Sequence, residues 1–232
     1  MQTIGLIGGM SWESTITYYQ IINEYVKETL GGLHSAKILL YSVDFAEIEH
    51  YQAQGEWDAS ANLLSDAAQR LEWAGADFIV ICTNTMHKVA PQIQQHLHIP
   101  LLHIADTVAD ALLAQGIQKT ALLGTKYTMT QDFYKARLVE RGIDVVIPTE
   151  SEIEVVNHVI YHELCLGVIS GTSRSKYQKI IARLKQEEGA EAVVLGCTEI
   201  GMLIRPEDSE LPVFDTTSIH ARAAAHKALF NA

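Results

Sequence analysis

The stretch GADFIVICTNT, residues 75–85, carries most of the information about the fold. It has a counterpart in GAEAVVLGCTE, residues 189–199, and the two align without a gap at an offset of 114 residues. Each stretch consists of Gly and Ala, a short apolar run and a cluster of small polar side chains. Continuous apolar runs of this length are typical of strands that are buried on both faces of a parallel sheet.

A second pair of segments points to the same internal repeat. IGLIG, residues 4–8, matches TALLG, residues 120–124, at an offset of 116 residues. Two matches at nearly equal offset indicate two similar lobes of about equal size. The alternative is chance resemblance, because apolar strands that follow a Gly-Ala pair are common.

Apolar runs elsewhere alternate with amphipathic stretches, a pattern that predicts an α/β fold with parallel sheets flanked by helices. We expect strands at Thr3–Ile7, Lys37–Val43, Phe78–Ile81, Leu101–Ile104, Thr120–Leu123, Asp144–Ile147, Ala192–Leu195 and Val213–Phe214. Helices are expected between most of them, for example at Ala59–Ala74, Asp132–Arg141 and Ser175–Glu188. Residues 1–100 with 211–232 should form the first lobe and residues 101–210 the second. The lobes should be related by a pseudo-twofold axis, with the active site in the cleft between them.

The composition excludes several classes of protein. Of the 232 residues, 48% are hydrophobic and 19% are charged, which favours a packed core over disorder. A net charge of -11 without a Lys/Arg cluster argues against binding of nucleic acid. No apolar run reaches the roughly 18 residues that suggest a membrane span, so we expect no membrane association.

The three cysteines are odd in number and have neither disulfide nor metal-ligand spacing, which favours a reducing cytoplasm. The first residues, MQTIG, lack a basic region, and we expect no signal peptide.

The polar clusters at residues 83–85 and 197–199 come at the carboxyl ends of predicted strands, where open parallel sheets bind ligands. A helix that begins there would hold a carboxylate with its backbone N–H groups and lower the pKa of a thiol. Cys197 is therefore a candidate base or nucleophile, and residue 83 would face it across the cleft. Cys82, one residue earlier on its strand, should lie in the core.

Each of these residues also has a purely structural interpretation. A cysteine at a strand end is often a small buried apolar side chain, and Thr83, Asn84 and Thr85 could be helix caps. Cys165 lies in a stretch with a helical pattern, where packing is the default. GLIGGM, residues 5–10, does not have the GxGxxG spacing, and Asp44 follows too late to bind a ribose. A dinucleotide site is therefore disfavoured.

Taken together, Gly8-Gly9-Met10, Asn84-Thr85-x-His87 and Gly196-Cys197-Thr198-Glu199 resemble the aspartate/glutamate racemase family over essentially the whole chain. The resemblance implies an isomerase that uses neither cofactor nor metal, acts on a small amino acid and forms a homodimer. In that family one thiol from each lobe acts on opposite faces of the α-carbon. One thiolate removes the α-proton while the other thiol returns a proton.

The resemblance also implies roles for individual residues. Cys197 would be the thiolate base. Asn84, Thr85 and Thr198 would bind the α-carboxylate and stabilise the carbanion. Met10 would line the cleft, and Thr125 and Thr128 would contact the substrate from the second lobe.

The sequence departs from the family at two places. The position of the first family cysteine is Thr83, whose hydroxyl is a far poorer base than a thiolate. We therefore expect efficient deprotonation of L substrates by Cys197 and slow turnover of D substrates. In addition, residues 44–52 lack the Arg of aspartate racemases, and Cys165 occupies the position of their Lys. The distal carboxylate would then need a neutral donor such as Gln52, or the substrate differs.

Three other functions stay open on these residues. The first is a broad-specificity amino-acid racemase. The second is an isomerase or decarboxylase that acts on small dicarboxylic acids, as a maleate isomerase does, through a strand-end cysteine. The third is a non-catalytic protein that binds small acids, in which Thr83 marks a lost activity.

Overall fold

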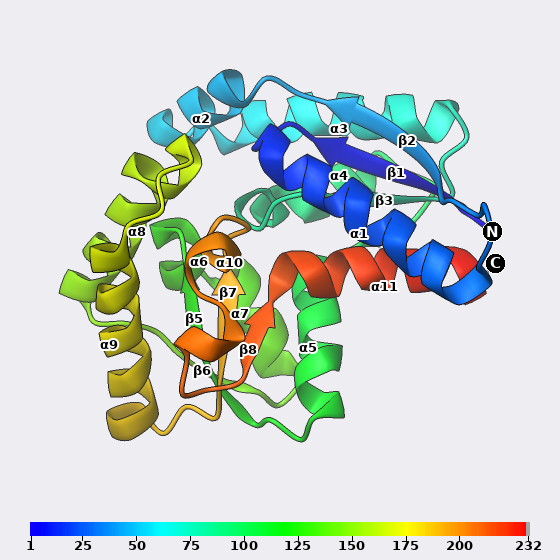
Figure 1. The fold of residues 1–232 in the computed structure, drawn as a ribbon. Coiled ribbons are helices and arrows are strands. Elements are labelled where there is room, and N and C mark those ends of the chain that lie inside the picture. The colour runs from blue at the N-terminus through cyan, green and yellow to red at the C-terminus, as the bar shows by residue number, and fades with distance from the viewer. Residues whose placement is uncertain (231–232) are drawn as a thin grey trace. The chain divides into compact units, whose positions relative to one another are not determined.

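The computed structural model describes residues 1–230, which fold as two compact units (Figure 1). The first unit consists of Met1–Ile104 and the C-terminal segment from Thr217, and the second consists of Ala105–Thr216. Each unit is built on a four-stranded sheet with helices on its faces. Among residues 1–230, no helix combines the length and the apolar character needed to cross a membrane.

The elements of the first unit are β1 (Thr3–Gly8), α1 (Trp12–Leu30), β2 (Lys37–Ser42), α2 (Phe45–Gln54), α3 (Trp57–Trp73), β3 (Phe78–Ile81), the 3₁₀ helix η1 (Thr85–Val89), α4 (Ala90–Gln95), β4 (Leu101–Leu102) and α11 (Thr216–Phe230). Those of the second unit are α5 (Ile104–Ala114), β5 (Lys119–Gly124), α6 (Lys126–Thr130), α7 (Asp132–Glu140), β6 (Asp144–Val146), α8 (Glu150–His162), the 3₁₀ helix η2 (Leu164–Leu166), α9 (Gly171–Glu188), β7 (Ala192–Gly196), α10 (Ile200–Leu203), the 3₁₀ helix η3 (Pro206–Asp208) and β8 (Val213–Asp215).

The two sheets have the same topology. The strand order is β2-β1-β3-β4 in the first sheet and β6-β5-β7-β8 in the second, and every pairing is parallel. The matching sequences at β1 and β5, and at β3 and β7, thus form the two central strands of each sheet. The prediction of an α/β fold with two similar lobes is confirmed.

The boundaries between the two units lie at different residues from those expected. Strand β4 pairs with β3 through Val80 and Leu102, and β8 pairs with β7 through Val194 and Phe214. The chain leaves the first unit after Ile104 and returns to it at Thr217, instead of changing after residues 100 and 210. The reason is that β4 completes the first sheet before α5 begins the second unit, and β8 completes the second sheet before α11 returns to the first unit.

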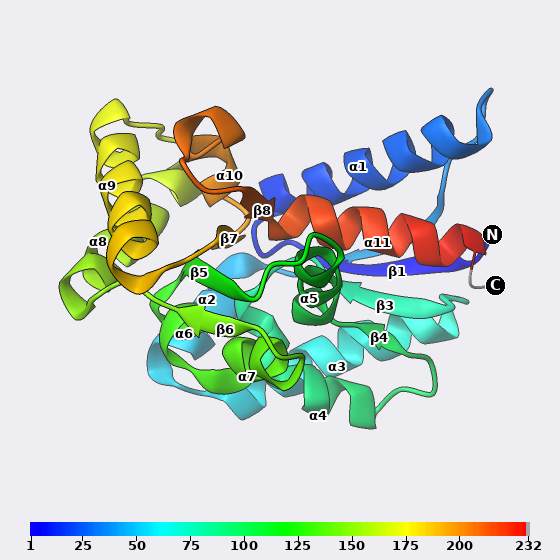
Figure 2. The same ribbon diagram turned by 90° about the horizontal axis from the view of Figure 1, so that it is seen from below.

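In the first unit the strand side chains alternate between two cores. Helices α1 and α11 lie on one face of the sheet, and α3 and α4 lie on the other (Figure 2). The α1/α11 core includes Ile4, Leu6, Tyr18, Ile22, Phe78, Val80, Cys82, Ala221, Ala224 and Ala225. The α3/α4 core, on the other face, includes Ile7, Met10, Ile48, Leu64, Leu71, Ile79, Ile81, Met86 and Ile93. This period of two decides which way each residue at a strand end faces.

In the second unit, α8 and α9 cover one face of the sheet (Figure 1). The α8/α9 core includes Leu123, Ile153, Val156, Val159, Tyr177, Ile181, Val193, Leu195, Cys197 and Ile200. Helices α5 and α7 are joined by an ion pair between Arg137 and Asp106 at 2.8 Å.

Candidate active site

Two glycines allow the central strands of the second unit to end in close contact. Gly124 and Gly196 are register partners at the ends of β5 and β7. A Cβ atom on Gly124 would lie 2.8 Å from the carbonyl oxygen of Gly196, which is closer than real Cβ atoms come to backbone. Because neither position carries a side chain, Thr125 and Cys197 begin their loops at neighbouring points on the sheet.

Thr125 and Thr128 form a small hydroxyl pair at the end of β5. Thr125 is the N-cap of α6, and its Oγ1 accepts a hydrogen bond from the backbone N–H of Thr128 at 3.3 Å. The two hydroxyl oxygens are 3.2 Å apart, and both residues are buried. The structure thus brings both predicted residues to the strand end next to that of Cys197. Their contact with substrate stays a prediction.

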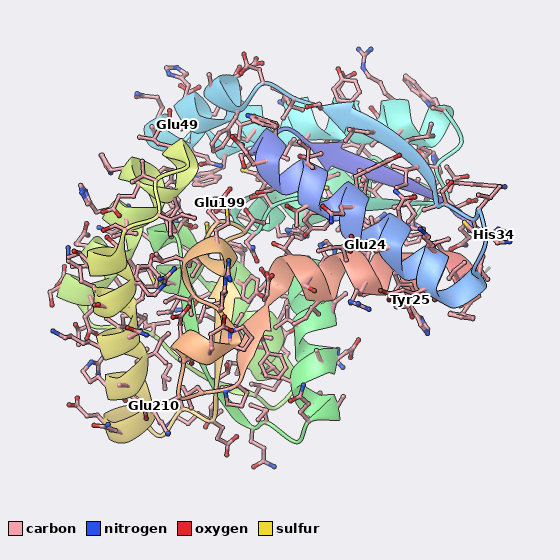
Figure 3. The ribbon with its side chains drawn as sticks, in the orientation of Figure 1. Glu24, Tyr25, His34, Glu49, Glu199 and Glu210 are labelled. Carbon is pink, nitrogen blue, oxygen red and sulfur yellow. The ribbon has the colours of Figure 1, made fainter. Side chains whose placement is uncertain are left out.

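Cys197 lies directly after β7 in the α8/α9 core and is only 7% exposed. Its Sγ donates a hydrogen bond to Oε2 of Glu199 at 3.0 Å. Oγ1 of Thr198 donates to the same carboxylate oxygen at 2.6 Å. Glu199 is itself 6% exposed and stands at the N-cap position of α10 (Figure 3). A thiol, a hydroxyl and a carboxylate therefore form one buried hydrogen-bonded group.

The expected lowering of the thiol pKa is wrong for this structure. Burial raises the pKa of Cys197 well above its ordinary value, and the negative charge of Glu199 adds to the effect. Sequence reasoning assigned the opposite effect to the following helix. That helix, α10, is only four residues long, and its N-cap position is occupied by a carboxylate. The thiol is therefore held protonated, with a proton acceptor beside it.

Thr83 occupies the place in the first unit that Cys197 occupies in the second, because β3 and β7 have the same position in their sheets. Thr83 is half-buried. Cys82 is fully buried in the α1/α11 core, and burial raises the pKa of its thiol. The prediction that Cys82 is a core residue is confirmed, and the residue equivalent in position to Cys197 is Thr83.

The remaining predicted residues of the first unit are buried close to their strand ends. Asn84 and Thr85 lie at the start of η1, and Asn84 makes no side-chain capping hydrogen bond there. Met10 is 3% exposed and packs in the α3/α4 core. Nε2 of Gln52, also buried, donates to Sδ of Met86 at 2.9 Å. Substrate contacts by these residues stay predictions.

A cluster of buried histidines in the first unit was not predicted from the sequence. The ring of His87 lies 4.5 Å from that of His103 and 5.6 Å from that of His220, measured between centroids. Nδ1 of His220 accepts a hydrogen bond from the Tyr18 hydroxyl at 2.8 Å, and its Nε2 lies 2.9 Å from the Leu102 carbonyl. The three rings come from distant parts of the chain, so no local pattern could have indicated them.

Glu199 belongs to the Gly196-Cys197-Thr198-Glu199 motif, but the sequence alone indicated no role for it. Its signal was its position two residues after Cys197, where a short turn brings the two side chains together. Within the described residues 1–230, no three His, Cys, Asp or Glu side chains are arranged to hold a metal ion. The thiol of Cys197, the carboxylate of Glu199 and the hydroxyl of Thr198 are in hydrogen-bond contact and can exchange protons.

The chain is similar to several known proteins over nearly its whole length. Residues 7–224 match the Asp/Glu/hydantoin racemase family. The broad-specificity amino-acid racemase RacX of Bacillus subtilis is 24% identical over 95% of both chains. A Yersinia pestis protein whose crystal structure is classed with the Asp/Glu racemases is 57% identical, with a TM-score of 0.93 over 99% of this chain and 100% of that one. An aspartate racemase homologue from Pyrococcus horikoshii is 37% identical, with a TM-score of 0.86 over 98% and 99%.

The chain therefore belongs to the Asp/Glu/hydantoin racemase family. Within that family it is an isomerase of the amino-acid racemase class.

Proposed function

We propose that the protein racemises aspartate, glutamate or related amino acids without a cofactor, with Cys197 as the base that removes the α-proton. Thr83 takes the position of the second acid–base group. The observation that carries the proposal is the equivalent placement of residues 83 and 197 after the central strands β3 and β7. A racemase needs proton transfer on two faces of one carbon, and a duplicated fold offers two such positions.

The second unit supplies the polar surroundings that carbanion chemistry requires. Deprotonation beside a carboxylate creates a second negative charge, which must be stabilised by donors already in place. Thr125, Thr128 and Thr198 place hydroxyl groups at the ends of β5 and β7. Asn84 and Thr85 provide donors after β3. We assign binding of the α-carboxylate to Asn84, Thr85 and Thr198, and contact with the rest of the substrate to Thr125 and Thr128.

The proposal includes a preference for L enantiomers. In the resembling racemases the second-lobe cysteine faces the α-proton of the L enantiomer, and here that cysteine is Cys197. The opposite position holds a threonine, whose hydroxyl is a much weaker base than a thiolate. We therefore assign fast α-proton exchange to L substrates and slow exchange to D substrates.

The range of substrates is proposed to be broad. The segment 44–52, which forms the N-cap and most of α2, contains no Arg, and Gln52 within it is bonded to Met86. A distal carboxylate therefore has no Arg or Lys partner in that segment. RacX, which is similar over nearly the whole chain, carries broad specificity in its name.

The test is α-proton exchange in D2O, followed by NMR on L- and D-aspartate, L- and D-glutamate and a panel of neutral amino acids. We expect loss of the α-proton signal from L substrates, abolished by Cys197→Ala. If exchange persists in that variant, Cys197 is not the base that removes the α-proton. Turnover of maleate or a malonate in place of exchange would favour the isomerase or decarboxylase, and binding without exchange would favour a small-acid-binding protein.

A homodimer in the cytoplasm is part of the same proposal, taken from the family resemblance and from the three cysteines, none of which forms a disulfide bond. Sedimentation of the purified chain tests the dimer directly.

A further inference from the structure

We infer that Glu199 is a third catalytic group, which accepts the thiol proton of Cys197 as that sulfur takes the α-proton of the substrate. The inference rests on the proposed function and deepens it, because it names the group that makes Cys197 competent. Glu199 touches a reacting atom, since its Oε2 lies 3.0 Å from Sγ of Cys197.

The resting thiol needs such a partner. Cys197 is 7% exposed in an apolar core, and its pKa is raised well above the ordinary value by burial and by the charge of Glu199. A neutral thiol cannot remove a proton from carbon, because only the thiolate has the free electron pair that is required. Water has little access to the sulfur, so the proton must pass to a group that is already in contact with it.

Glu199 is placed to receive that proton. Its Oε2 accepts hydrogen bonds from both Sγ of Cys197 and Oγ1 of Thr198, at 3.0 and 2.6 Å. The two donors hold the carboxylate oxygen toward the thiol. The carboxylate is therefore already in contact with the proton that it is to receive. The Thr198 bond thus orients Glu199, as the second partner of a catalytic base commonly does.

The step is a balanced double proton transfer. The S–H bond of Cys197 breaks as the O–H bond of Glu199 forms, and the sulfur electron pair takes the α-proton from the substrate. The C–H electrons remain on the α-carbon as the carbanion. The thiol ends protonated by the substrate, and the Glu199 proton is released to solvent before the next turnover. No oxidant, reductant or further reactant is needed.

Other titratable groups near the thiol do not offer the same route. Tyr177 on α9 interacts electrostatically with Cys197, but burial raises the pKa of its hydroxyl, which donates to the Val156 carbonyl at 3.0 Å. Cys165 on η2 also interacts electrostatically with Cys197, and a negative charge on Cys165 raises the pKa of the Cys197 thiol further. Glu199 is the carboxylate that contacts the sulfur directly.

The test uses Glu199→Gln, which keeps the shape of the side chain but cannot take up the proton. Two quantities are measured on the intact protein: α-proton exchange of an L substrate at pH 7, and alkylation of Cys197 by iodoacetamide across pH 7–10, followed by mass spectrometry of its peptide. We expect exchange to fall about 100-fold, as is typical when a general base is lost. We expect alkylation to become several-fold faster, because removal of the negative charge lowers the thiol pKa.

Slower α-proton exchange together with faster alkylation distinguishes a catalytic role of Glu199 from a purely structural one. Glu199→Asp keeps a proton acceptor and should retain more exchange than Glu199→Gln. Glu191→Gln is the matched control at the other end of β7, where the carboxylate accepts from the backbone of Gln118 and Lys119, and it should change neither quantity.

Unchanged or faster exchange in Glu199→Gln overturns the role of Glu199. Absence of exchange in the unchanged protein is a separate result, because it overturns the proposed function and the role of Glu199 with it.

Discussion

The carbonyl oxygen of Thr83 and Nδ1 of His87 are joined by a hydrogen bond of 2.8 Å. Nε2 of the same ring accepts from the backbone N–H of Ile104 at 3.2 Å. Because Nε2 is an acceptor, the ring proton lies on Nδ1 and is donated to Thr83. Burial and the neighbouring rings lower the pKa of His87 well below its ordinary value, so the ring is neutral. A neutral histidine thus ties the backbone of residue 83 to the segment after β4.

Replacement of His87 by Phe should therefore destabilise the protein. The Thr83 carbonyl and the Ile104 N–H would both lose a buried partner, at a cost of about 1–3 kcal/mol for each group. We expect a loss of about 2–4 kcal/mol in the free energy of unfolding, measured by urea denaturation at pH 7. His98→Phe is the control, because the His98 side chain is almost fully exposed. Equal stability of the two variants would show that the bridge contributes nothing.

Acidification should weaken the fold through His220. Burial lowers the pKa of this histidine from 6.5 to about 4. The unfolded chain binds the proton first as the pH falls, so stability is complete above pH 6.5 and is lost progressively toward pH 4. The loss at pH 4 amounts to about 3 kcal/mol. His87, whose pKa is also lowered, acts in the same direction.

Urea denaturation between pH 7 and pH 4.5 measures this loss. Carboxylates contribute to acid denaturation as well, so the comparison is with His220→Gln. That variant should be less stable at pH 7, because the Tyr18 hydroxyl and the Leu102 carbonyl lose their partner. Its stability should also depend less steeply on pH. Parallel curves for the two proteins would contradict a neutral, buried His220.

The glycine pair at the ends of β5 and β7 should not tolerate a methyl group. A Cβ atom on Gly124 meets the Gly196 carbonyl oxygen at 2.8 Å, which forces a shift of backbone. We expect Gly124→Ala to cost about 1–3 kcal/mol and to reduce α-proton exchange. Gly171→Ala is the control, since nothing lies within 4 Å of a Cβ atom there. Thermal unfolding of both variants decides the matter, and a Gly124→Ala protein as stable as Gly171→Ala would refute the steric argument.

The sequence carried enough information for the eight strands and for the sheet membership of all except β4 and β8. Each strand is a short apolar run, and β1 and β3 have clear repeats at β5 and β7. The sequence also placed Cys82 in the core and residues 83 and 197 at strand ends. Successive side chains of a strand point to opposite faces, so the direction of one side chain fixes that of its neighbour. The sheet membership of β4 and β8 depended on long-range pairing, which no local pattern records. The thiol pKa of Cys197 was misjudged because burial and a neighbouring carboxylate are properties of the folded site.

The variant Thr83→Cys tests the preference for L substrates. A thiol at position 83 supplies a base on the face where the proposal has only a hydroxyl, so exchange of D substrates should rise at least about 10-fold. Exchange of L substrates should stay within a few-fold of the unchanged protein, because Cys197 still acts on them. Cys82→Ala is the control: it should lower stability by opening a small cavity in the α1/α11 core and leave the D-to-L ratio of exchange unaltered. The double variant should keep the gain, since the position of the thiol decides the outcome. A D-to-L ratio that does not change in Thr83→Cys would mean that residue 83 does not face the α-carbon.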